Sequence, residues 1–186
     1  TAVTRIPETS VAAPAVIGSL ARSWNHIQLR MIELDRDRGL ELARQLAMTT
    51  YRSEIDFDTR DGIASYLEHQ GVKLRQRFHP GAYAALVGAM DAHDVGRDRG
   101  GIVEALRRLA TAEVALHGVG IEGDILYGPR QVKALVAAAE AAGVEAAYHE
   151  IRSTKGHDAF LVEWDQVSAI LGSALVREEK EIAASA

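Results

Sequence analysis

Two residues in the second half of the chain have the types and order of an acid–base pair. Asp124 follows one short apolar stretch, and His157 follows a second one further along. An imidazole that acts as a general base needs a carboxylate on its far nitrogen, which fixes the tautomer and stabilises the imidazolium. The spacing alone is equally compatible with two solvated surface residues. The predicted strands and helices that position the two side chains must therefore be considered.

Residues 111–186 alternate between predicted strands and predicted helices. Strands are expected over 112–120 and 144–151, helices over 130–143 and 163–182, and a loop over 152–161. This alternation is typical of a parallel α/β sheet. In such a sheet reactive residues collect beyond the carboxyl ends of the strands, so Asp124 and His157 are expected on the same rim. Two strands alone make a marginal sheet, and this one requires further strands beside it.

Residues 19–110 are predicted to be helical throughout. Apolar side chains recur at helical spacing over 20–35, 39–55 and 61–78, with a break expected at Gly71, and again after Pro80. No stretch here shows the alternation of a strand. We therefore expect an irregular segment over 1–18, a helical layer over 19–110 and an α/β part over 111–186.

Composition narrows the function classes. The chain has 186 residues, a formal net charge of −5 and no cysteine, which argues against a nucleic-acid partner, disulfides and thiolate chemistry. No apolar run reaches the roughly 18 residues of a membrane span, and the first residues do not form a signal peptide, so we expect a cytoplasmic protein. The remaining histidines have no metal-ligand spacing and the glycines no phosphate-binding pattern, so neither a metal nor a nucleotide site is expected.

Four segments, in the same order, closely resemble the homoserine O-acetyltransferase family: LARQLAMTTYRSEIDFDTR, SYLEHQGVKLRQRFHPGAYAALVGAMDAHDVGR, GIEGDILYGPRQ and EIRSTKGHDAFLVEWDQ. The resemblance extends from about Ala21 to Leu171. It implies a partial α/β-hydrolase fold in which residues 19–110 form a helical lid before the last two strand–helix units. It also implies a homodimer through the lid helices. The implied reaction is acyl transfer from acetyl-CoA, a co-substrate, to the hydroxyl of L-homoserine in methionine biosynthesis, without a bound cofactor.

The resemblance also implies roles for four residues. Asp124 and His157 match the family's triad acid and base, Arg52 matches an arginine that pairs with the amino-acid carboxylate, and Asp158 matches an aspartate that holds the amino group. A planar guanidinium can grip a carboxylate through two parallel hydrogen bonds, which suits Arg52 to its role. Apart from the resemblance, Arg52 could equally be an exposed helix residue, and Asp158 could cap a helix.

The sequence departs from the family at the nucleophile. Double displacement in this family uses a serine on a tight strand-to-helix elbow, which requires a small-x-Ser-x-Gly pattern. None of the serines has this pattern: Ser10, Ser19, Ser23, Ser53, Ser65, Ser153, Ser168, Ser173 and Ser185. The chain also passes from Arg60 to SYLEHQG where family members usually have a longer stretch.

Three interpretations remain open. The chain can be the C-terminal piece of an acyltransferase whose N-terminal half is lost or carried on another chain. It can be a non-catalytic remnant whose lid helices mediate association. The full protein can also be a related α/β-hydrolase with another acyl acceptor.

Overall fold

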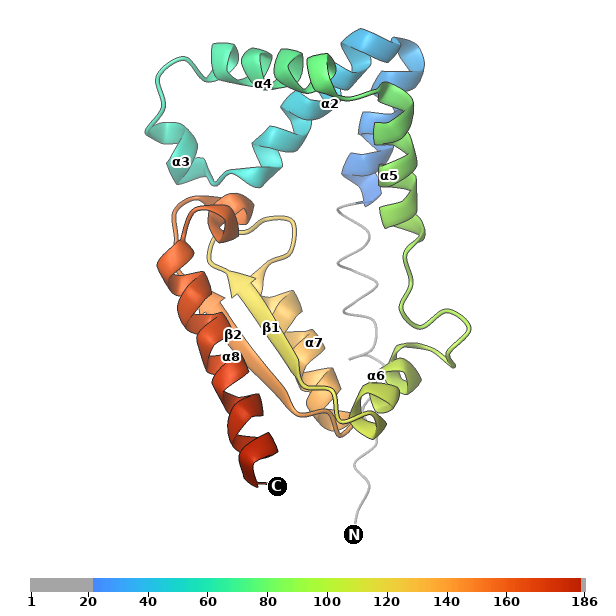
Figure 1. The fold of residues 1–186 in the computed structure, drawn as a ribbon. Coiled ribbons are helices and arrows are strands. Elements are labelled where there is room, and N and C mark those ends of the chain that lie inside the picture. Colours follow the sequence, from blue (N-terminus) through green and yellow to red (C-terminus); the bar gives the residue numbers. More distant parts are fainter. Residues whose placement is uncertain (1–21, 185–186) are drawn as a thin grey trace.

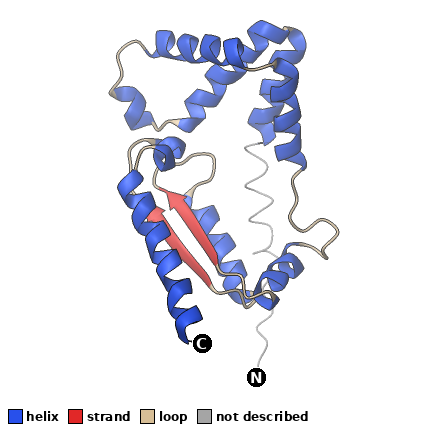
Figure 2. Cartoon of the chain, in the orientation of Figure 1, coloured by secondary structure: helices blue, strands red, loops and turns tan. Residues whose placement is uncertain are grey.

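The structure, a computed structural model, describes residues 22–184 (Figure 1). The irregular segment predicted over 1–18 lies outside this range. Helices form an arch over a small sheet, and strands occur only in the lower, C-terminal part of the described chain (Figure 2). The predicted order of a helical half followed by an α/β half is therefore confirmed. No helix in the described range is long and apolar enough to cross a membrane.

Within the described residues, the first helix of the helical half covers 22–34. The helices that follow it are α2 (Arg36–Tyr51), α3 (Glu54–Asp58), α4 (Ile63–Arg77), α5 (Pro80–Ala92) and α6 (Ile102–Thr111). Helices α2 and α4 pack closely around a cluster of Ile32, Leu40, Ala43 and Leu74. The single helix predicted over 39–55 is wrong at its end, because the chain turns at Arg52 and Ser53 caps the separate helix α3. Helix α6 packs against α7 (Pro129–Ala141) of the sheet half around Leu106 and Ala139.

The sheet consists of two parallel strands, β1 (Leu116–Ile121) and β2 (Ala146–Ile151). Their register places Ile121 beside Ile151, so both carboxyl ends meet at one edge. Helix α7 (Pro129–Ala141) makes the crossover, and α8 (Trp164–Ala184) follows β2. The two helices lie on either side of the sheet, as Figure 1 shows. The arch carries α2 and α3 directly above the edge toward which the strands point.

The strands start later than their apolar stretches predict. Residues 112–115 instead close α6: Glu113 takes a left-handed φ of 54°, and the amide of Val114 donates to the carbonyl of Leu109. Helix α7 ends in the same way, with Gly143 at φ 90° and the amide of Val144 donating to Ala139. At the end of each helix, a residue with left-handed φ lets the following amide donate to a helix carbonyl that would otherwise lack a partner. Each strand therefore begins only after its preceding helix is capped.

The break predicted at Gly71 is wrong, because α4 runs through this residue. Gly71 is buried where α4 crosses α2, and a Cβ atom there would lie 2.8 Å from the carbonyl oxygen of Glu41. The glycine therefore serves close helix packing and does not interrupt the helix. Substitution tests this directly.

We expect Gly71→Ala to destabilise the protein by about 1–3 kcal/mol, because the added methyl group overlaps fixed backbone. The control is Gly88→Ala in α5, where a Cβ would meet nothing within 4 Å. That change should stabilise the protein by about 0.5–1 kcal/mol, since alanine is the better helix former. Urea unfolding of the two variants measures both. Equal gains in stability would show that the α2–α4 contact is looser than described.

Candidate active site

Asp124 and His157 lie together beyond the carboxyl ends of the two strands. Asp124 sits in the turn that follows β1, where its amide donates to the carbonyl of Ile121. Its Oδ1 accepts hydrogen bonds from the amides of Leu126 and Tyr127 at 2.7 and 3.0 Å. Its Oδ2 lies 2.8 Å from His157 Nδ1. One carboxylate oxygen is thus fixed by backbone, and the other is directed at the imidazole.

The residues around His157 hold its ring in one orientation. The loop predicted over 152–161 contains a 3₁₀ helix, η1 (Gly156–Leu161), and His157 is on its first turn. The rings of Tyr51, Tyr127 and Phe160 surround the imidazole at centroid distances of 5.6–5.8 Å. Because Nδ1 faces Asp124, Nε2 points away from the carboxylate. This is the orientation that a general base requires.

Hydrogen bonding keeps the Asp124 carboxylate ionised. Burial alone would raise the pKa of Asp124, since its side chain is only 3% exposed. The hydrogen bond from His157 and those from the Tyr127 and Leu126 amides outweigh burial, so the pKa lies below its ordinary value. Burial also raises the pKa of Tyr51 and of Tyr127. The imidazole therefore has one fixed negative charge on one side and neutral aromatic rings around it.

Arg52 and Asp158 form an ion pair beside the imidazole. Arg52 ends α2, and its Nε lies 3.3 Å from Asp158 Oδ2. The two side chains are only 18% and 16% exposed, so an exposed helix arginine is excluded at position 52. Asp158 does not cap a helix, because η1 already begins after Lys155. The structure thus brings all four predicted site residues into one place.

Several neighbours of this site were not predicted from the sequence. Asp56 is almost fully buried and accepts a hydrogen bond from Lys155 Nζ at 2.7 Å. The Ser53 hydroxyl donates to the carbonyl oxygen of Thr154. Both contacts join the helical half to the segment that carries His157. Their partners lie about a hundred residues apart, so no local pattern points to them.

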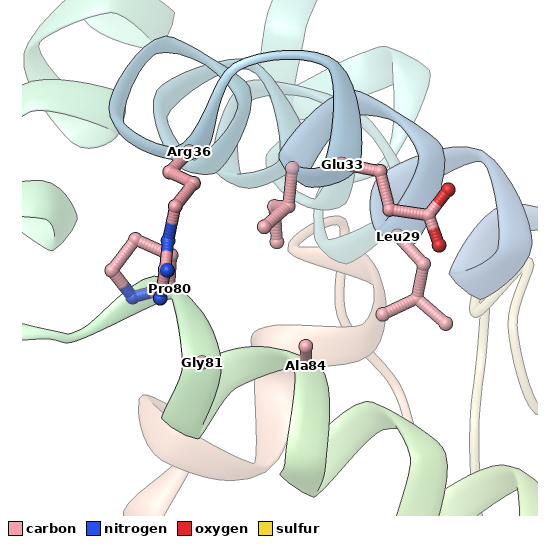
Figure 3. Close-up of a pocket in the computed structure, with 7 residues that line it drawn as sticks. Leu29, Glu33, Arg36, Pro80, Gly81 and Ala84 are labelled. Carbon is pink, nitrogen blue, oxygen red and sulfur yellow. The ribbon is translucent and has the colours of Figure 1, made fainter.

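Two of the pockets in the described part of the chain lie near the helical half. One, of about 590 Å³, lies beside Asp124 and is mostly apolar, lined by Thr49, Arg52, Ser53, Glu54, Ile55, Phe57, Ile63, Leu67, Gly123 and Ile125. The other, of about 340 Å³, lies between the helix over 22–34 and α5. Figure 3 shows it, with Glu33 and Arg36 on one wall and Pro80, Gly81 and Ala84 on the other. Only the first of these two pockets includes a predicted site residue.

Comparison with known proteins finds homoserine O-acetyltransferases that are similar to this chain. The chain is 44% identical over 178 residues to a homoserine O-acetyltransferase from Thermus thermophilus, an alignment that covers 89% of this chain and 45% of the relative. It is 34% identical over 200 residues to the homoserine O-acetyltransferase from Thermobifida fusca, covering 90% and 51%. No family model matches the chain. The chain thus spans about half the length of the curated relatives it matches.

Solved structures agree on the fold. The crystal structure of homoserine O-acetyltransferase from Staphylococcus aureus superposes with a TM-score of 0.67 at 31% identity, covering 84% of this chain and 47% of that one. An esterase structure superposes with a TM-score of 0.71 at 12% identity, covering 82% and 50%, and so bears on the fold alone. The predicted partial α/β-hydrolase fold is confirmed.

The lowered pKa of Asp124 predicts a loss of stability in acid. The unfolded state takes up a proton at a higher pH than the folded state does, so the stabilisation from Asp124 is present above the ordinary aspartate pKa of about 4 and is lost as pH falls through the folded value. Asp124→Asn should therefore flatten the dependence of unfolding free energy on pH below about 5. Urea unfolding at a series of pH values measures this.

The exposed residue Asp61 provides the matched control. Asp61→Asn should leave the acid dependence as it is in the parent chain. An unchanged dependence in Asp124→Asn as well would mean that the carboxylate is not held by His157 and the two amides.

Proposed function

Because the chain belongs to the homoserine O-acetyltransferase family, we propose that it supplies the acid–base and amino-acid-binding groups of an acyl-transfer site. The proposed reaction moves an acetyl group from acetyl-CoA to the hydroxyl of L-homoserine. The observation that carries the proposal is the 2.8 Å contact between Asp124 and His157 on the rim of the parallel sheet. The Arg52–Asp158 pair next to it adds the means to bind an amino acid.

His157 is proposed as the general base in both halves of a double displacement. A serine outside these 186 residues would give its proton to His157 Nε2 and attack the thioester carbonyl, and the thiol of coenzyme A would leave with that proton. The homoserine hydroxyl would then give its proton to Nε2 and attack the acyl-serine, and the serine would regain the proton. Asp124 holds the Nδ1 proton throughout and stabilises the imidazolium that forms each time.

Arg52 and Asp158 are proposed to bind the charged groups of the amino acid. The two side chains carry opposite charges and lie within 3.3 Å of each other. An α-amino acid presents a carboxylate and an ammonium group at similarly short separation, so it can replace this internal pair with two pairs of its own. Asp158 directly follows His157 in the chain, which ties the bound amino group to the catalytic base. The substrate hydroxyl is thereby directed toward the imidazole.

Reconstitution tests the proposed reaction. The chain should be co-expressed with the part of the Thermus thermophilus relative that it does not match and assayed with acetyl-CoA and homoserine. We expect the two co-expressed parts together to acetylate homoserine and the isolated chain to be inactive.

Two substitutions test the proposed residue roles in the reconstituted enzyme. His157→Ala should lower kcat/KM by roughly 10³-fold or more, because the base is lost. Arg52→Lys should chiefly raise KM for homoserine, by about tenfold or more, because a lysine cannot make the paired hydrogen bonds.

Two outcomes would contradict the proposal. Turnover by the isolated chain would show that a nucleophile is present within it. A well-folded mixture that forms a complex and yet stays inactive would leave association as the role of this chain.

Association through the helical half is the second candidate function. Large apolar side chains there are exposed, among them Ile27 at 47%, Leu34 at 79% and Met90 at 61%. We propose that the protein is cytoplasmic and forms a homodimer through these lid helices. The dimer interface would then cover the exposed apolar side chains. Sedimentation of the isolated chain should then show a dimer, and Leu34→Glu should shift it toward the monomer. A monomeric parent chain at micromolar concentration would exclude this candidate.

A further inference from the structure

We propose that Asp56 is a positioning residue that holds His157 and Arg52 in their working arrangement, by anchoring the segment before His157 to the junction of α2 and α3. The inference rests on the proposed function only in taking His157 as the base. Asp56 does not contact the imidazole itself. It acts through Lys155 and Arg52.

Asp56 is a buried carboxylate surrounded by cations. Its residue is 2% exposed, the lowest exposure of any charged residue in the described core. Oδ1 accepts from Lys155 Nζ at 2.7 Å, and Oδ2 accepts from Arg60 Nε at 3.0 Å. Arg52 Nη1 lies 3.9 Å from Oδ2. A single carboxylate therefore contacts three cationic side chains, one of which belongs to the proposed substrate site.

The same junction holds the backbone that leads to His157. The Ser53 hydroxyl accepts from the amide of Asp56 and donates to the carbonyl of Thr154. Gly156, at φ 68°, lies so close that a Cβ atom on it would be 2.6 Å from the backbone nitrogen of Ser53. The segment 154–156 therefore lies directly on the α2–α3 junction. Its position fixes that of His157, the next residue.

Neutralising Asp56 would release this arrangement. The structure describes one ion pair for Lys155, and its partner is Asp56. Without that carboxylate, the lysine side chain would turn to solvent. Of the ion-pair partners that the structure describes for Arg52, only Asp158 would remain. Asp158 is the residue proposed to bind the amino group of the substrate. Burial alone would raise the pKa of Asp56, but hydrogen bonds from Lys155 and Arg60 outweigh it and lower the pKa. The carboxylate is thus charged at neutral pH, and its neutralisation would leave Arg52, which is only 18% exposed, with less compensating negative charge.

The test compares Asp56→Asn and Lys155→Met with Glu41→Gln. Glu41 is a matched control, because it is also a buried acid on the helical half and pairs with Arg75 and Arg38, between α2 and α4 and away from residues 152–158. Proton NMR follows the signal of the His157 Nδ1 proton, and hydrogen exchange follows the amides of residues 154–158. Both readouts work on the isolated chain, whether or not it catalyses anything.

We expect Asp56→Asn to speed exchange at these amides by about tenfold or more and to broaden or abolish the Nδ1 proton signal. Lys155→Met should act in the same direction to a smaller extent, and it remains informative if Asp56→Asn fails to fold, because Lys155 is half exposed. Glu41→Gln should lower overall stability and leave both readouts at His157 unchanged.

Two results would overturn the inference. One is an unchanged Nδ1 signal and unchanged exchange in folded Asp56→Asn and Lys155→Met. The other is a loss of the signal in Glu41→Gln equal to that in Asp56→Asn, since the effect would then be general loosening. Failure of the reconstituted acyl transfer would leave these outcomes untouched, so the two proposals fail separately.

Discussion

The parallel register of β1 and β2 is the constraint on which the site depends. Ile121 and Ile151 end their strands side by side, so the segments carrying Asp124 and His157 leave the sheet at the same edge. Two strands of this length would be marginal alone in water, and the packing of α7, η1 and α8 on their faces stabilises them. The Asp124 carboxylate then contacts the imidazole with one oxygen, while the amides of its own turn hold the other.

The helical half contributes to this rim and does not only cover it. The α2–α3 junction brings Tyr51 against the imidazole and Arg52 against Asp158. Gly156 allows the two backbones to come into contact, and the buried Asp56 carboxylate pairs with Lys155 across the two halves. At this junction Asp56 pairs with Lys155, and the Ser53 hydroxyl donates to the carbonyl oxygen of Thr154, so two contacts join the halves of the chain.

Sequence patterns predicted the features that depend on local order. Helical spacing and the alternation of strands and helices located the two halves, and strand order placed Asp124 and His157 on one rim. The segments shared with the family added Arg52 and Asp158, which no periodicity would have found. The failures have physical causes. A glycine in a helix suggests a break, but Gly71 serves a close crossing with Glu41 on another helix. The i, i+4 spacing of Arg52, Asp56 and Arg60 is typical of solvated helix pairs, and the contact of Asp56 with Lys155, 99 residues further along, has no local sequence signal.

The long sequence separation between the two halves of the site also determines at which point during synthesis the site can form. Asp56 and Lys155 are 99 residues apart, and Ser53 and Thr154 are 101 apart. At roughly 5–20 residues per second, a ribosome needs about 5–20 s to make the intervening chain. Helices α2 and α4 can pair early in that interval, because their contacts are short in sequence. Asp56 and its neighbouring arginines are synthesised well before Lys155, so the contacts that join the two halves at this rim form only after Lys155 has been made.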